Sequence, residues 1–194
     1  MSEVIDSLRR DHGNLERLVR LLNGRMSVLP HPGVEDVQLV VDALAYLTHF
    51  PDVSHHPLED RIVDRLRDKR SLPSGFAEEI EAQHATIARQ GNDLMRDLES
   101  VVRGEDSAWQ PEALAWDLVA PNVRLYAERL RHNMAVEELI LFPTALGQLN
   151  ADDWQMIRDA SPKDEHDPLF QAQVDERFRQ LRLAIADAAH CGCE

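Results

Sequence analysis

The 194-residue sequence contains few of the residues that cross-link or shape small disulfide-rich folds. Its only two cysteines, Cys191 and Cys193, lie at the C-terminal end, so no disulfide can cross-link the core. Glycine is sparse at eight residues, and aromatic side chains make up 5% of the chain. No alternating strand pattern appears, whereas Leu, Ala, Arg and Glu recur at three- and four-residue spacing. These features predict an all-α protein that is stabilised by packing.

Basic charge is also scarce, since the formal net charge is -14. Binding phosphates requires a concentrated basic face, so this charge argues against a nucleic-acid partner and against anionic membranes. No apolar run approaches the roughly 18 residues of a membrane span, and residues 1–6 lack the basic and apolar regions of a signal peptide. We therefore expect a cytoplasmic protein with no membrane partner.

Apolar residues at helical spacing predict four long helices that are separated by short breaker segments. The predicted helices cover about residues 2–27, 33–66, 76–101 and 111–142. The second should kink at Pro51 and Pro57, and Phe142-Pro143 should end the fourth. Four amphipathic segments with short connections predict an up-down-up-down four-helix bundle.

The last part of the chain predicts a C-terminal helical extension. We expect a short helix over about residues 152–160 and a longer one over about residues 168–189. The apolar face of the longer helix must pack on the bundle or on a second copy of the chain, which would make a homodimer. We therefore divide the chain into a bundle domain, residues 1–148, and an extension, residues 149–194, whose cysteine-containing tail is expected to be frayed.

Polar residues interrupt the apolar stripes of all four long helices. His12 lies between Leu8 and Leu15, for example, and His84 occupies the stripe between Ile80 and Ile87. Imidazoles and carboxylates in a core are costly unless something binds them, so they predict a metal site. The predicted metal-binding residues are His12, His55, Glu59, His84, His132 and Glu137. Nitrogen and oxygen ligands without thiolate suit iron, manganese or zinc, and six ligands from four helices fit two ions better than one.

Two neighbouring pairs compete on the second helix, namely His55 with Glu59 and His56 with Asp60. Helical phase places the first pair on the stripe that carries the apolar residues, and the second pair about 100° round the helix. We therefore predict His55 as the ligand, and the kink at the prolines leaves His56 open as an alternative.

The fourth helix carries a second alternative. His132 and Glu137 are five residues apart, so they lie on adjacent strips of the helix that both border a central site. Asn133, four residues before Glu137, is the other residue that fits an inward position. We expect Glu138 at the surface or outside the ligand set.

Together these segments resemble the hemerythrin-like HHE cation-binding family over about residues 1–148. The matching segments are Asp11-His12, His55-His56-Pro57-Leu58-Glu59-Asp60, His84, and His132 through Glu137-Glu138 to Leu141-Phe142-Pro143. The resemblance implies a non-haem centre of two irons with an oxo or hydroxo bridge. It further implies that the nitrogen ligands are His12, His55, His84 and His132. The bridging carboxylates it implies are Glu59 and Glu137.

One departure from the oxygen-carrying members bears on function. Ala88 stands where those proteins have a second histidine on the third helix, and a missing nitrogen donor opens a coordination position. The resemblance therefore implies binding of dioxygen, nitric oxide or peroxide with redox turnover, in gas or redox sensing, iron handling or stress protection. The alternative is a helical interaction module whose metal is structural.

Overall fold

A computed structural model describes residues 3–28, 34–103, 116–160 and 167–190, and all regular structure within these ranges is helical. The predicted all-α class is therefore confirmed. The α-helices are α1 (Glu3–Val28), α2 (Val34–Phe50), α3 (His56–Asp68), α4 (Phe76–Arg103), α5 (Trp116–Val136), α6 (Phe142–Gln148), α7 (Ala151–Ala160) and α8 (Arg179–His190). Two π turns, η1 (Pro51–His55) and η2 (Glu137–Leu141), and one 3-10 turn, η3 (Glu176–Phe178), complete the described helices.

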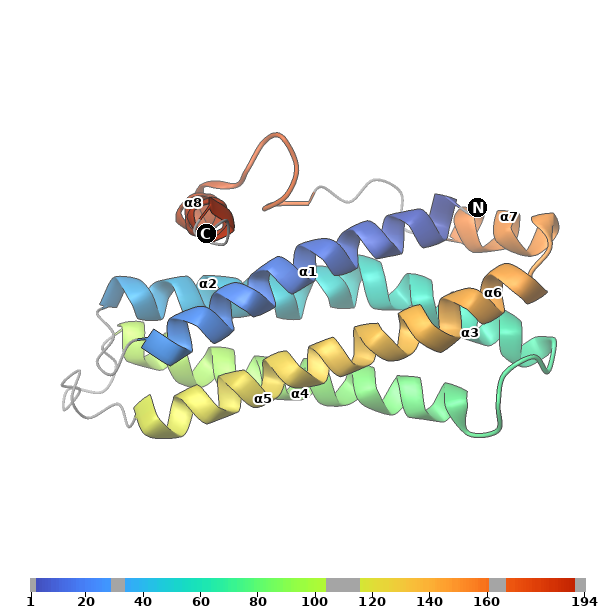
Figure 1. Cartoon of the computed structure of the whole chain (residues 1–194), viewed down its shortest axis with the longest axis horizontal. Helices are drawn as coiled ribbons and strands as arrows, with labels where there is room; N and C mark the ends of the chain where they lie inside the picture. Colours follow the sequence, from blue (N-terminus) through green and yellow to red (C-terminus); the bar gives the residue numbers. More distant parts are fainter. Residues whose placement is uncertain (1–2, 29–33, 104–115, 161–166, 191–194) are drawn as a thin grey trace.

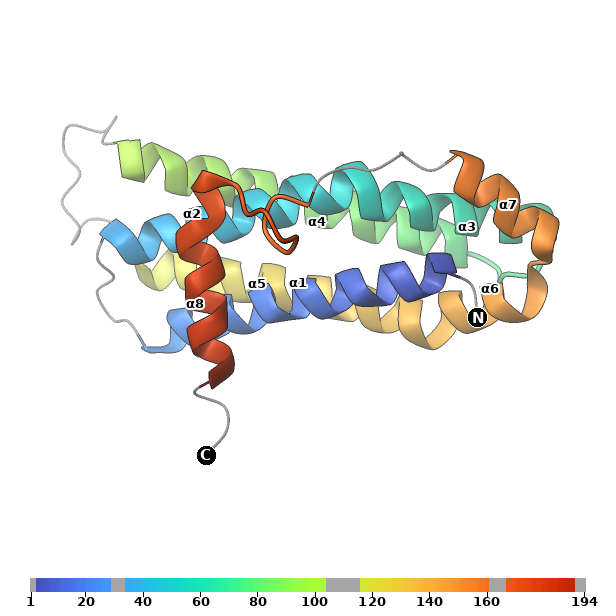
Figure 2. The same cartoon turned by 90° about the horizontal axis from the view of Figure 1, so that it is seen from above.

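Four long helical segments lie lengthwise beside one another, as Figures 1 and 2 show. They are α1, α2 continued through η1 into α3, α4, and α5 continued through η2 into α6. The most extensive packing joins α2 to α4, α1 to α5 and α4 to α5. None of the helices in the described ranges combines the length and the apolar character needed to cross a bilayer.

The chain stays helical through Pro51, where we expected a kink or break. Proline has no N–H, so the carbonyl of Leu47 loses its usual helical donor at position 51. The hydroxyl of Tyr126 on α5 lies 3.4 Å from that carbonyl oxygen and donates to it instead. The π turn η1 begins at Pro51 and adds one residue to the turn, which shifts the phase of everything that follows.

The fourth segment is longer than its sequence predicts. We expected Phe142-Pro143 to close this helix, and that expectation is wrong, because α6 runs on to Gln148. Pro143 lies in the first turn of α6, directly after the π turn η2, where a proline fits more easily than in a helix interior.

The apolar core is divided into two clusters by a layer of polar side chains. One cluster includes Leu15, Leu44, Ile87 and Leu130. The other contains apolar residues of α3, α6 and α7 together with those near the starts of α1 and α4. Along every long segment, the polar residues fall where the chain passes from one cluster to the other. The chain thus has two apolar regions with a polar layer between them.

The C-terminal extension packs on the same chain. The predicted helix over about residues 168–189 is correct only in its second half, because residues 167–175 form turns and α8 begins at Arg179. In Figure 2, α8 lies across α1 and α2, and Phe178, Leu181 and Ile185 are buried in the first apolar cluster. The guanidinium of Arg177 donates to Asp42 of α2 at 3.1 Å. The tail containing Cys191 and Cys193 lies outside the described residues.

Candidate metal centre

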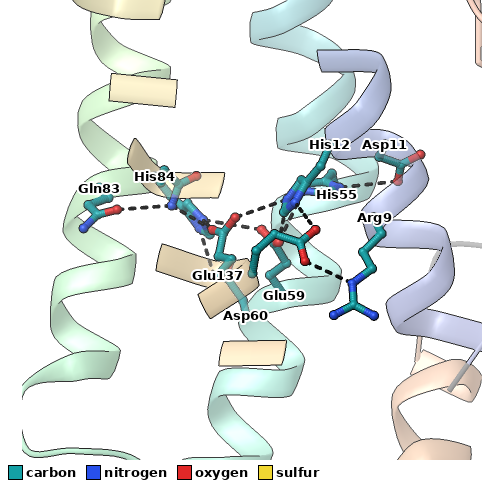
Figure 3. A network of polar contacts seen from close by, with 11 residues as sticks. Arg9, Asp11, His12, His55, Glu59, Asp60, Gln83, His84 and Glu137 are labelled. Atoms are coloured by element: carbon teal, nitrogen blue, oxygen red, sulfur yellow. Dashed lines mark hydrogen bonds and ion pairs between the residues drawn. The ribbon is translucent and has the colours of Figure 1, made fainter. Parts of the chain in front are cut away.

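The polar layer brings five of the six predicted residues together, as Figure 3 shows. His12 comes from α1, His55 from the end of η1, Glu59 from α3, His84 from α4 and Glu137 from the start of η2. All five side chains are buried, and both glutamates have 0% of their surface exposed. Both π turns thus meet the polar layer, and π turns frequently occur at functional sites because they redirect side chains.

The two glutamates each divide their oxygens between two groups of histidines. Oε1 of Glu59 lies 3.5 Å from Nε2 of His12 and 3.3 Å from Nε2 of His55, whereas its Oε2 lies 3.6 Å from Nε2 of His84. Glu137 repeats this arrangement, with Oε2 at 3.2 Å from His12 Nε2 and Oε1 at 3.1 Å from His84 Nε2. Both carboxylates therefore span the space between His12 with His55 on one side and His84 on the other.

Each of these three imidazoles also faces a further carboxylate through its other nitrogen. Nδ1 of His55 lies 3.3 Å from Asp11, and Nδ1 of His84 lies 3.3 Å from Asp60. Nδ1 of His12 lies 3.2 Å from Glu138, whose carboxylate also accepts from the guanidinium of Arg9 at 3.0 Å. A carboxylate at the outer nitrogen fixes the orientation of a metal-binding imidazole and increases its basicity. The inner nitrogens of His12 and His84 thereby face both buried glutamates, and that of His55 faces Glu59.

The protonation of each histidine in this layer depends on the carboxylates around it. Burial disfavours protonated His12, but the carboxylates of Glu137 and Glu59 outweigh burial and raise its pKa to about 9. The same balance, with Glu59 and Asp11 opposing burial, raises the pKa of His55 to about 10. Burial works against the charged form of His84 too, yet Asp60 and Glu137 raise its pKa to about 9. Burial opposes ionisation of Glu59, but His55 and His12 hold the pKa of that carboxyl well below its usual range.

The same side chains fit a metal ion. Both oxygens of Glu59, Oε2 of Glu137 and Nε2 of His12 meet no hydrogen-bond partner of good geometry among the described residues. Such buried atoms are rare unless another group binds them. Possible ligand atoms form two sets, and within each set they all lie within 4.8 Å of one another. One set comes from His12, His55, Glu59 and Glu137, and the other from His56, Glu59 and His84. Imidazole and carboxylate donors without sulfur suit iron, manganese or zinc.

His132 does not join this layer, and its predicted place on the core-facing stripe is wrong. Its side chain is exposed and lines a surface groove with Gln83, Thr86 and Arg129. The prediction followed the leucines of the fourth helix, but Leu125 is 46% exposed and Leu139 is 76% exposed. Residues 125, 132 and 139 are seven apart and therefore share the solvent-facing side of the helix.

Two buried residues that the sequence analysis ranked second are in the layer instead. Asn133 is 1% exposed, and its amide donates to Glu137 Oε1 at 2.7 Å and to Gln83 at 3.3 Å. His56 is 5% exposed and stacks on His84 with ring centroids 4.1 Å apart. Two features of the sequence point to these residues. Asn133 lies four residues before Glu137 and so shares its helical face, and prolines that disturb helical phase flank His55 and His56.

Comparison with known protein families matches residues 3–145 to the hemerythrin HHE cation binding domain. The matched span contains every residue of the polar layer described above. A comparison with curated protein sequences gave no match.

Proposed function

The chain belongs to the hemerythrin HHE cation-binding domain family, and on this basis we propose that it is a non-haem di-iron protein that binds dioxygen, nitric oxide or peroxide. The observation that carries the proposal is the way Glu59 and Glu137 each direct one oxygen toward His12 and the other toward His84. This is the placement that two bridging carboxylates need. Bundle proteins with two metal ions commonly use carboxylates from facing helices in this way.

Each residue of the layer has a specific role in the proposal. His12 and His55 bind one iron through Nε2, His84 binds the other, and Glu59 and Glu137 bridge the pair. The outer carboxylates of Asp11, Asp60 and Glu138 hold the imidazoles in orientation. Iron held in this way supplies reversible one-electron redox chemistry to small ligands.

The surroundings of the layer favour small ligands over larger substrates. Apolar clusters lie on both sides, and the polar side chains between them are at most 8% exposed in the case of His12, His55, Glu59, His84 and Glu137. Each iron accepts about six donors, which is more than these side chains provide, so positions stay open for an exogenous ligand. We propose a role in gas or redox sensing, iron handling or stress protection in the cytoplasm.

The proposal includes the architecture that holds the centre. We propose that residues 1–148 form an up-down-up-down four-helix bundle and that residues 149–194 form an extension packed against it. The match to the family over residues 3–145 and the packing of α8 on α1 and α2 support this division.

Anaerobic loading of the full chain with ferrous iron tests the function. We expect about two irons per chain after removal of free metal, as in other di-iron bundles. Glu59→Ala should remove most of this iron, because that residue contacts both histidine groups. Exposure of the loaded protein to dioxygen, and separately to nitric oxide, should change its absorption spectrum rapidly.

Two results would contradict the proposal. Iron that stays fully bound in Glu59→Ala would show that the buried layer is not the metal site. A protein that holds two irons yet remains spectrally inert toward both gases would instead support a structural metal in a helical interaction module.

A further inference from the structure

His56, which the sequence leaves open as an alternative to His55, lies inside the polar layer beside it. We propose that His56, and not His132, is the fourth nitrogen ligand, and that it binds the same iron as His84. Ligand atoms of His56, Glu59 and His84 lie within 4.8 Å of one another. This inference rests on the proposed two-iron function.

The position of the ring supports a ligand role. The imidazoles of His56 and His84 are nearly parallel, with 16° between their planes and 4.1 Å between their centroids. Nε2 of His84 faces both bridging carboxylates, so a ring stacked beside it lies next to the same metal position. Metal–nitrogen bonds of about 2.0–2.1 Å place two donors of one ion about 4 Å apart at most. An imidazole donates in the plane of its ring, so the two stacked rings must turn relative to one another to direct both nitrogens at one ion.

Helix geometry explains how consecutive residues reach two different irons. Neighbouring residues of a helix point about 100° apart, so His55 and His56 are directed at different parts of the core. The extra residue in η1 shifts the phase at this junction, and both side chains are buried. His55 turns toward His12, with 4.9 Å between His12 and His55 ring centroids, while His56 turns toward His84. Glu59 follows within one turn and lies between the two groups.

The fourth segment shows why a ligand is needed from η1 and α3. Its inward residue at this level is Asn133, whose amide nitrogen donates to Glu137 and is therefore directed at a bridging carboxylate rather than at a metal. His132 lies on the exposed face of the same helix. With His56, each iron has two imidazoles and shares the same two carboxylates, so the two positions have matched donor sets.

The test measures the number and affinity of bound metal ions in the full chain, with cobalt(II) added without oxygen as the probe. We use His56→Ala and His56→Leu, because leucine fills the buried space without binding metal. The controls are His132→Ala and His49→Ala, which remove exposed histidines of the same helical segments. Far-UV circular dichroism of each metal-free variant confirms its helical content.

We expect wild type and both control variants to bind about two ions, and both His56 variants to retain one at wild-type affinity. The affinity for the second ion should fall by more than the roughly 10–100-fold that follows loss of a carboxylate at the outer nitrogen of a ligand histidine. Two ions at unchanged affinity in His56→Leu would overturn the inference, and so would loss of an ion in His132→Ala. A wild-type protein that binds fewer than two ions would instead contradict the proposed function itself.

Discussion

Replacing Gly91 by alanine should destabilise the protein, even though alanine is the better helix former. Gly91 lies in the middle of α4, where it faces Thr48 of α2 and Tyr126 of α5. A Cβ atom at this position would meet Cγ2 of Thr48 at a distance that real Cβ atoms do not reach, and two ring carbons of Tyr126 at 2.9 and 3.2 Å. Glycine is therefore required by the close approach of three helices.

The expected size of the effect follows from how firmly these neighbours are held. The hydroxyl of Thr48 donates to the carbonyl of Leu44 at 2.8 Å, and Tyr126 is fully buried with its hydroxyl on Leu47. Neither can move aside cheaply, so we expect the upper part of the roughly 1–3 kcal/mol that overpacking costs. Better helix propensity returns about 1 kcal/mol. The net loss should be about 1–2 kcal/mol, which lowers the melting temperature by several degrees at about 2–4 °C per kcal/mol.

Urea unfolding followed by circular dichroism, with a chelator present, measures this loss without any contribution from metal. Gly24→Ala is the matched control, since Gly24 lies in α1 with open space around it and should gain up to about 1 kcal/mol. His84 lies two turns before Gly91 on the same helix, so a displaced α4 should also weaken metal binding there. Stabilisation of both variants by the same amount would refute the close-packing argument.

Three further predictions concern charge, orientation and docking. The pKa values of His12 and His55 in the folded chain lie above the unfolded value of 6.5. The stability that these histidines contribute to the metal-free chain is therefore complete below pH 6.5 and is lost as the pH rises through about 9 to 10. Urea midpoints that increase from pH 6 to 10 would contradict this prediction. Asp11→Asn should weaken metal binding by about 10–100-fold in chelator competition while helical content stays unchanged, and an unaltered affinity would show that Asp11 does not orient His55. Leu181→Ala should cost about 2–5 kcal/mol in urea unfolding without changing metal content, whereas unchanged stability would mean that α8 is not firmly docked.

Much of the polar layer can be predicted from the sequence, because its residues interrupt otherwise regular apolar stripes. His12 falls between Leu8 and Leu15, which are 0% and 1% exposed, and His84 falls between Ile80 and Ile87, which are 0% and 2% exposed. In both helices the heptad-like spacing continues straight through the polar residue. The stripe alone therefore predicts that each of these histidines points into the core.

The same reasoning fails on the fourth segment, because there leucines lie on both the buried and the exposed face of the helix. Its buried face is built from Val123, Ala127, Leu130 and Met134, whereas Leu125 is exposed. Alanine and valine suit a face that packs closely on neighbouring helices, and a leucine stripe on the solvent side misdirects a phase argument. His132 follows that stripe outward.

The place of His56 fails to be predicted for a different reason. A phase argument assumes 3.6 residues per turn, and the π turn from Pro51 to His55 breaks that assumption at one point in the chain. Pro51 signals a disturbed helix, but the sequence does not say whether the chain kinks, breaks or widens there. The structure shows that it widens, and the hydroxyl of Tyr126 donates to the carbonyl of Leu47 that Pro51 leaves without its helical donor.

Charge balance links metal binding in the polar layer to the release of protons. The carboxylates that contact the three imidazoles at either nitrogen are Glu59, Glu137, Asp11, Asp60 and Glu138. When the imidazoles bind metal they are neutral, and Arg9 pairs with one of these carboxylates, that of Glu138. The side chains of Asp11, Asp60 and Glu138 are 22%, 49% and 34% exposed, so water screens their charges. The fully buried carboxylates of Glu59 and Glu137 carry two negative charges that bound metal would balance. Without metal, protons on the imidazoles take over this role, which is why the pKa values of His12, His55 and His84 are raised. Metal binding near neutral pH must therefore displace protons, and the layer exchanges one set of positive charges for another while its carboxylates stay in place.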